Sequence, residues 1–189
     1  MALNSIQLAS QALIKIGAMP ISSFDDGSAE STVAAALYAT TRDALLSAHP
    51  WNFATAQRDL PRLETGPVAD YDCAFQLPVD FLRALSAGGG GRGRGVEYRI
   101  AENRLHADIP AITLTYIYRP VENAFPAFFD EALIARLAAE YCLPLTESTS
   151  RADALHRLAE ERVRTARLID AQQDTPARFV DFTLVEVRG

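Results

Sequence analysis

The chain has 189 residues, of which 49% are hydrophobic and 22% are charged, and its formal net charge is −6 at pH 7. This length allows one well-formed core, and the negative charge argues against general nucleic-acid binding, which needs a basic surface. No apolar run reaches the roughly 20 residues that span a bilayer, so we expect no membrane partner.

The first predicted element is an amphipathic helix over residues 3–16. Apolar residues recur in it at spacings of three and four, and Gly17 stands where a glycine commonly ends a helix. A polar loop follows. Ser28 is then a suitable N-cap for a second helix, because its side-chain oxygen can accept a hydrogen bond from a free backbone N–H of the first turn.

The second helix is expected to extend to about Ala48. Pro50 ends it, because proline disfavours the α conformation of the residue before it. We expect its buried stripe to consist of Val33, Leu37, Thr41, Ala44, Leu45 and Ala48.

The helix is followed by His49-Pro50-Trp51-Asn52-Phe53, which contains the only tryptophan of the chain. We expect Trp51 and Phe53 to fold back onto the core. His49 has the side chain of a general base, but the neighbouring sequence offers it no partner. We therefore interpret His49 as a structural residue at the helix end.

Residues from about 55 to 120 have the pattern of β-structure. Short strands are expected at 75–77 and 81–85, on either side of a corner at Pro78. The GGGGRGRG run at 88–95 lacks the GxxxxGK[ST] order of a phosphate-binding loop, and no strand-to-helix switch surrounds it.

We interpret this glycine-rich run as a flexible hairpin tip. Its two arginines, Arg92 and Arg94, are candidates to face DNA or a tail protein, where they would contact backbone phosphate without reading bases.

The second half of the β region contains the clearest strand signals. Residues 96–100 and 104–107 flank Glu102-Asn103, a two-residue hairpin signal that lacks the usual glycine. Residues 112–118 alternate one by one between the two faces of a strand.

Helical periodicity returns at Pro126 and extends to about Pro144. A last helix is expected over 151–173, with Asp153–Arg157 and Glu160–Arg164 as ion pairs on its exposed face. In the helix that starts at Pro126, the buried side is expected to contain Phe129, Leu133, Leu137 and Tyr141. In the last helix it is expected to contain Leu155, Ala159, Val163 and Ala166.

Cys73 and Cys142 lie far apart, without a CxxC or histidine spacing. We interpret them as buried free thiols. We expect no metal site and no cofactor.

Residues 176–189 form an extended C-terminal arm with an apolar, β-prone sequence. The arm either adds a strand to the sheet of its own chain or reaches a neighbouring subunit by strand addition, with a frayed terminus as a third reading. Its candidate contact residues are Arg178, Phe179, Val180, Phe182, Leu184, Val185 and Val187.

The predicted fold class is therefore α+β. A bundle of about four helices carries a β-rich insertion between the second and third helices. A single domain is expected over 1–175, with the insertion at about 55–120 and the arm at 176–189.

Several blocks of this sequence resemble one family. The most specific are HPWNFA at 49–54 and LPVDFLR at 77–83. Weaker ones are ALIKIGA at 12–18 followed by Ile21, DGS at 26–28, RDALL at 42–46, FPAFF at 125–129 and LAAE at 137–140. On these blocks the chain resembles the head-to-tail connector (adaptor) proteins of tailed bacteriophages and gene transfer agents. The nearest group is the tail tubular protein A and podovirus tail-accessory family.

The resemblance implies a structural virion protein at the head–tail junction, assembled in the cytoplasm of a bacterial host. Such proteins form a ring, typically of about twelve copies, below the portal protein. The ring extends the DNA channel and binds the next tail or stopper protein. The C-terminal extension commonly grips the portal in this family, which favours the inter-subunit reading of the arm. Passing double-stranded DNA would be a non-specific neighbour.

Two other functions remain open at this point. Some tail-accessory proteins are linked to peptidoglycan cleavage, which needs two carboxyl groups across the sugar, and 24 acidic residues leave such a pair possible. No Asp or Glu stands in a distinctive setting, so we expect no enzyme. The other alternative is an α+β interaction module of unrelated function.

Overall fold

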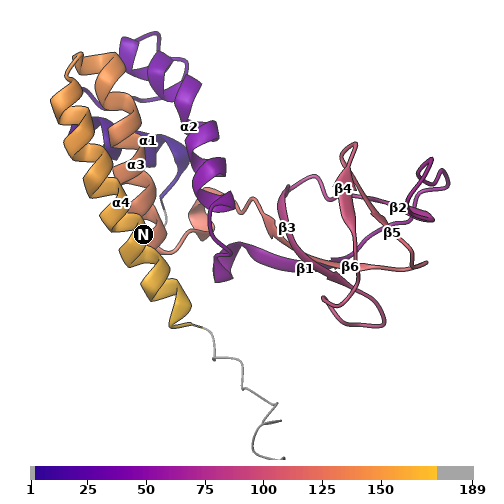
Figure 1. The fold of residues 1–189 in the computed structure, drawn as a ribbon. Coiled ribbons are helices and arrows are strands. Elements are labelled where there is room, and N and C mark those ends of the chain that lie inside the picture. Colours follow the sequence, from indigo (N-terminus) through magenta and orange to yellow (C-terminus); the bar gives the residue numbers. More distant parts are fainter. Residues whose placement is uncertain (1–2, 174–189) are drawn as a thin grey trace, which may run out of the picture.

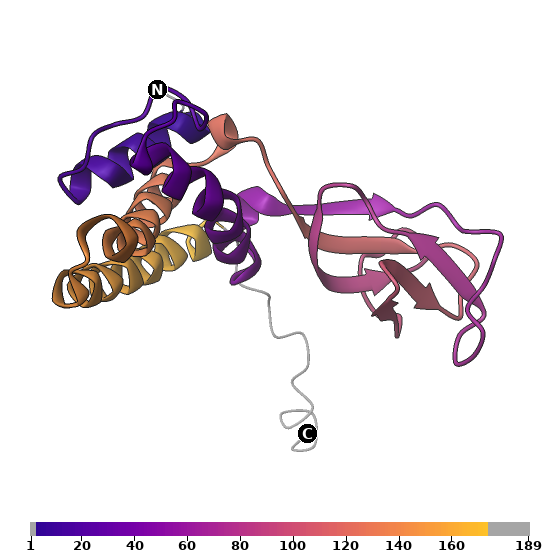
Figure 2. The same cartoon turned by 90° about the horizontal axis from the view of Figure 1, so that it is seen from above.

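The computed structural model describes residues 3–173. Four α-helices and two three-stranded antiparallel sheets make up this part, which confirms the α+β class (Figure 1). The helices lie together as one part, called here the helical part. The strands form a second part, the β part, which projects from one side of the helices (Figure 2).

Local signals set the ends of the first two helices, α1 (Ser5–Lys15) and α2 (Ala29–Ser47). Asn4 and Gln7 form a reciprocal capping box at the start of α1. Gly17 has a φ of +76° just after α1, a conformation that favours glycine. Ser28 accepts a hydrogen bond from the backbone N–H of Ser31 and so caps α2, as predicted.

The buried stripe expected on α2 is right for three residues and wrong for three. Leu45 is buried, and Val33 and Leu37 are half-buried and pack against the helical core. Ala44 and Ala48 are exposed, and Thr41 is only half-buried. The buried residues of α2 are Ser31, Ala34, Tyr38, Leu45 and Leu46. The helix is rich in alanine on several sides, so its sequence does not single out one face.

Helix α3 (Ala127–Thr146) lies in the centre of the helical part and packs against each of the other helices. The four residues expected on its buried side, Phe129, Leu133, Leu137 and Tyr141, are all fully buried, as predicted. The helix continues two residues past Pro144. Glu147, in a left-handed conformation with φ of 54°, then turns the chain into α4 (Thr149–Ala171).

The dry face of α4 is as predicted, since Ala159 and Ala166 are buried and Leu155 and Val163 pack against the helical core. The two predicted ion pairs of its exposed face do not form. The ion pairs found among residues 3–173 do not include either of them.

The first sheet has the strand order β1-β6-β3, with β1 at Thr55–Asp59, β3 at Phe81–Gly88 and β6 at Thr113–Tyr118. Both β1 and β3 pair antiparallel with the central β6. Strand β6 is therefore a clear strand, as predicted, and β3 is longer than expected.

The second sheet has the order β2-β5-β4, with β2 at Cys73–Gln76, β4 at Arg99–Ala101 and β5 at Arg104–Ala107. Glu102 and Asn103 connect β4 and β5 with φ values of 52° and 57°. Positive φ at both central residues is the requirement of a type I′ turn. The predicted hairpin is thus confirmed.

The glycine-rich run is not a hairpin tip, because β3 and β4, the strands on its two sides, belong to different sheets. The run folds back along β3. Ser86 Oγ donates to the carbonyl of Gly93 at 2.7 Å, and the N–H of Val96 donates to Ala87. A Cβ at Gly88 would collide with the backbone of Arg92, so this close return requires glycine.

Buried residues form two clusters, one among the helices and one between the two sheets. Trp51, at the end of α2, belongs to the helical cluster, and Phe75 and Tyr116 belong to the β cluster. Cys73 and Cys142 are both buried and free, as expected.

Candidate functional site

The helical and β parts meet at three chain segments, which we call the joint: residues 49–54, 77–83 and 119–129. The first two are the blocks that carry most of the family resemblance, and the third contains the FPAFF block.

Aromatic side chains fill the centre of the joint. Trp51 is 0% exposed, and its ring nitrogen donates to the carbonyl of Leu45 at 3.1 Å. The ring centroid of Phe129 lies 5.2 Å from that of Trp51 and 4.9 Å from that of Phe53, both in edge-on geometry. Phe125 is also edge-on to Phe53 at 6.0 Å. Such pairs stabilise beyond the area that they bury.

Asp170, near the end of α4, closes the joint on one side. Its side chain is 1% exposed and accepts the backbone N–H of Asn52 at 3.0 Å, while Asn52 Nδ2 donates to the carbonyl of Asp170 at 2.8 Å. The sequence offered no signal for this contact, since Asp170 reads as one more charge on a helix rich in charges.

His49 is brought near Asp170, but the two do not form a catalytic pair. His49 Nε2 lies 3.9 Å from Asp170 Oδ2, which is too long for a hydrogen bond. Burial, together with the positive charge of Arg167, lowers the pKa of His49 below its usual value of 6.5. The neutral ring packs edge-on to Trp51 at 4.8 Å, which agrees with a structural role.

A network of four charged residues ties α2 to the chain between β6 and α3. Arg42 Nη1 lies 2.7 Å from Glu122 Oε1, and Arg42 Nε lies 2.9 Å from Asp43 Oδ1. Arg119 in turn donates to both oxygens of Asp43, with 2.7 Å the shortest distance. Arg42 and Asp43 of the RDALL block therefore have a structural role, because they hold α2 to the segment between β6 and α3.

The LPVDFLR block holds the start of β3 against the end of β6. The N–H of Arg119 donates to the carbonyl of Asp80 at 2.9 Å, and the hydroxyl of Tyr116 donates to the Asp80 side chain at 3.2 Å. Phe81 stacks on Tyr116, and Leu82 packs against the helical core. The blocks at 42–46, 49–54, 77–83 and 125–129 thus each have a packing role at or beside the joint.

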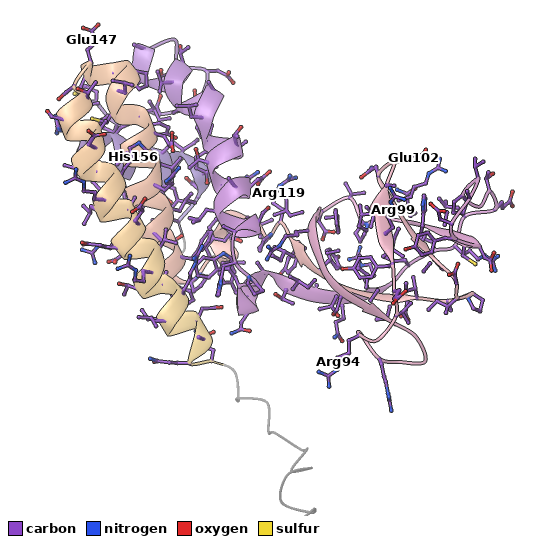
Figure 3. All side chains as sticks on the ribbon, viewed as in Figure 1. Arg94, Arg99, Glu102, Arg119, Glu147 and His156 are labelled. Carbon is purple, nitrogen blue, oxygen red and sulfur yellow. The ribbon has the colours of Figure 1, made fainter. Side chains whose placement is uncertain are left out.

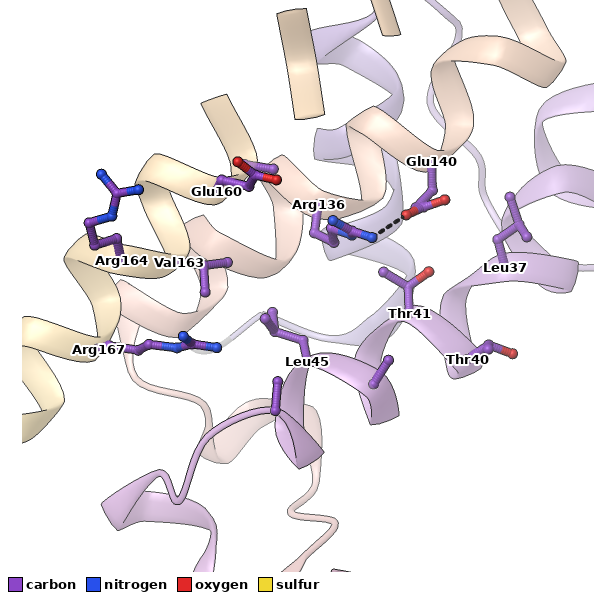
Figure 4. A pocket seen from close by; sticks show the side chains of 13 residues that line it. Leu37, Thr40, Thr41, Leu45, Arg136, Glu140, Glu160, Val163, Arg164 and Arg167 are labelled. Atoms are coloured by element: carbon purple, nitrogen blue, oxygen red, sulfur yellow. Dashed lines mark ion pairs between the residues drawn. The ribbon is translucent and has the colours of Figure 1, made fainter. Parts of the chain in front are cut away.

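The helical part carries a groove of about 610 Å³ between α2, α3 and α4 (Figure 4). Its α2 wall is formed by the stripe that was expected to be buried, including Leu37, Thr41 and Ala44. On the α4 side, Val163 and Ala159 continue the apolar lining. The groove exists because α4 packs on α3 and leaves this side of α2 uncovered.

Charged side chains rim the groove. Arg136 and Glu140 of α3 pair at 2.9 Å, shown by the dashed line in Figure 4. Arg164 and Arg167 of α4 take part in none of the ion pairs formed within residues 3–173. Arg167 Nε is also buried without a hydrogen-bond partner in that range.

Arg92 and Arg94, the predicted DNA- or tail-facing residues, are both exposed on the β part. Figure 3 shows Arg94 away from the helical part. The structure does not bring these arginines to the groove or the joint. The predicted arm residues Arg178, Phe179, Val180, Phe182, Leu184, Val185 and Val187 lie outside the described residues.

Other kinds of site were sought in the described part of the chain. Residues 3–173 contain no group of three or more His, Cys, Asp or Glu side chains placed to hold a metal ion. None of the helices in this range has the length and apolar content to cross a membrane. Burial raises the pKa of Asp130, on α3, to about 6, and its Oδ1 has no hydrogen-bond partner within the same range.

The sequence was also compared with known proteins. A scan against models of protein families finds no match, and a search among curated proteins finds no relative.

Proposed function

We propose that this protein is a structural connector of a tailed phage or gene transfer agent, which forms a ring below the portal and joins the DNA-filled head to the tail. The observation that carries the proposal is the meeting of four of the resemblance blocks, the two most specific ones among them, at or beside the joint. Trp51 of HPWNFA packs against Phe129 of FPAFF, and Asp80 of LPVDFLR binds Arg119 beside the RDALL residue Asp43.

This convergence supports the proposal because the blocks then form a single structural unit. Together they determine how the β part projects from the helices. A chance resemblance would have no reason to select residues that contact one another across the sequence, as Trp51 of HPWNFA and Phe129 of FPAFF do with ring centroids 5.2 Å apart.

The outline of the chain also suits a subunit of a ring. A ring needs a heterologous contact, in which two different surfaces of the subunit meet around the circle. The helical part and the projecting β part differ in secondary structure and in shape, so they can meet as two different surfaces (Figure 2). The net charge of −6 suits a channel along which DNA phosphates slide without binding.

The proposal is tested by negative-stain electron microscopy of the protein mixed with its portal protein. We expect a second ring stacked on the portal ring. Portal rings that never gain this density at saturating protein would overturn the proposal. Portal is needed in the mixture, because a ring of this kind forms on a template.

A truncated chain tests the role of the arm. A protein that ends at residue 175 should remain folded by circular dichroism and should no longer bind the portal. Normal binding of the truncated chain would remove the arm from the proposal while leaving the ring in place. A zymogram on purified cell wall tests the enzymatic alternative, and we expect no clearing.

A further inference from the structure

The groove between α2 and α4 has the properties of a binding site for an extended peptide. Its volume of about 610 Å³ falls within the usual range for ligand pockets, roughly 300–1,000 Å³. Its floor is apolar, and in the described part of the chain nothing covers Ala44 or Ala48, which are exposed. An apolar surface in a concave site is a typical place for a partner.

The rim indicates the charge of the occupant. The rim holds Arg136, Arg164 and Arg167 against Glu140 and Glu160, an excess of one positive charge. Arg164, Arg167 and Glu160 form no ion pair with residues 3–173, and the buried Nε of Arg167 lacks an acceptor there. A buried donor without an acceptor is costly, so the occupant should supply carboxylate or carbonyl oxygens at this point.

The sixteen residues that follow the described part fit these requirements by sequence. Residues 178–187 read RFVDFTLVEV. In an extended chain alternate side chains point to the same side, which places Val180, Phe182 and Leu184 on one face. Asp181 and Glu186 supply carboxylates.

The geometry also allows the segment to reach the groove of its own chain. Helix α4 ends at Ala171, and its groove residues run from Ala159 to Arg167. Eight residues of helix span about 12 Å, a distance that four or five extended residues cover. Residues 174–177, with Pro176 among them, are enough for the reversal of direction.

We propose that residues 178–187 dock into the groove of their own chain, with the face of Val180, Phe182 and Leu184 against α2 and a carboxylate at Arg167. Attachment to α4 favours this arrangement over a second copy, because a short tether gives an effective concentration of the order of millimolar. The proposal does not rest on the connector function. If the arm also binds a portal, it must first leave the groove.

Cross-linking of the full-length protein tests the proposal. The double variant Ala44→Cys/Leu184→Cys places one thiol in the groove and one in the arm, and a short bismaleimide then joins them if they are close. Cys73 and Cys142 are buried and should not react in the folded protein. The matched control is Ala35→Cys/Leu184→Cys, because Ala35 is exposed half a turn around α2 from Ala44.

An intramolecular cross-link between positions 44 and 184, identified by mass spectrometry and at least severalfold above the control, is the expected result. Two outcomes would overturn the proposal. One is a cross-link yield equal to that of the control. The other is a purely intermolecular product, which also forms when the two single-cysteine chains are mixed and which would assign the groove to a second copy.

A charge variant tests the role of Arg167 with the same cross-link. Arg167→Ala in the Ala44→Cys/Leu184→Cys background should lower the ratio of docked to free arm about tenfold, the effect of losing one charge-assisted hydrogen bond. Unchanged cross-linking in this variant, with the protein still folded, would overturn the role given to Arg167.

Discussion

Asp170 and Asn52 are 118 residues apart in sequence, yet the Asp170 carboxylate accepts the backbone N–H of Asn52 at 3.0 and 3.2 Å. This pair fixes the end of α4 to the segment that leads into β1. Asp170→Ala should lower the free energy of unfolding by about 1–3 kcal/mol, because it removes the charged acceptor of the Asn52 N–H.

Asp170→Asn is the matched control for that substitution. The amide keeps an oxygen acceptor and loses only the charge, so its cost in urea unfolding should be smaller than that of Asp170→Ala. Equal costs for the two variants would show that the hydrogen bond to Asn52 does not determine stability here.

Trp51 is expected to stabilise the fold strongly. Its side chain is 0% exposed, and truncation to alanine leaves a large cavity in the aromatic centre of the joint. Trp51→Ala should therefore cost about 3–5 kcal/mol in urea unfolding. A loss below about 1 kcal/mol would contradict the packing role that we give to this residue.

Two of the three ion pairs of the charged network should differ in strength. Arg42 and Glu122 have side chains only 15% and 22% exposed, whereas Arg119 is 40% exposed beside Asp43. A double-mutant cycle for Arg42 and Glu122 should give a coupling of about 0.5–3 kcal/mol. The cycle for Asp43 and Arg119 should give less, about 0.2–1 kcal/mol, and should weaken more in high salt. A larger coupling for the second pair would contradict the burial argument.

The stability of the protein should depend on the ionisation of Asp130. Burial raises its pKa from 3.8 to about 6 in the folded state. Well below pH 3.8 both the folded and unfolded states are protonated, so the side chain has no pH-dependent cost. Between pH 4 and 6 the unfolded state ionises first, which lowers stability as the pH rises, and the cost is constant above pH 6.

Asp130→Asn tests this pH dependence, since the amide does not ionise. The variant should gain stability over the natural protein between pH 4 and pH 6, by up to about 3 kcal/mol, and keep that gain at pH 7. Urea unfolding at pH 4 and pH 7 measures both states. A difference between the proteins that stays constant with pH would exclude the raised pKa.

Tyr141 offers a stabilising substitution. Its hydroxyl is buried and has no hydrogen-bond partner within residues 3–173. Tyr141→Phe keeps the ring and removes the unsatisfied group, so the melting temperature should stay equal or rise, with a gain of up to about 1–3 kcal/mol. A clear loss of stability would show that the hydroxyl does have a partner. Tyr116→Phe serves as the contrast, because the Tyr116 hydroxyl donates to Asp80 and its loss should destabilise.

The features that the sequence predicted correctly depend on few neighbouring residues. Ser28 caps α2 through an N–H three residues away, and Glu102-Asn103 turns the hairpin through their own backbone angles. The apolar side of α3 was also clear, because the helix is central and its buried residues recur at helical spacing. Local chemistry is enough to determine each of these.

The features that only the tertiary structure decided depend on where distant elements lie. The sequence of α2 offers apolar residues on more than one side, and the position of α4 decides that Thr41 and Ala44 line a groove instead of a core. The glycine-rich run returns along β3 because its flanking strands join different sheets. Asp170 has no sequence signal at all, because a carboxylate on a charged helix becomes a buried acceptor only when the backbone of Asn52 is packed against it.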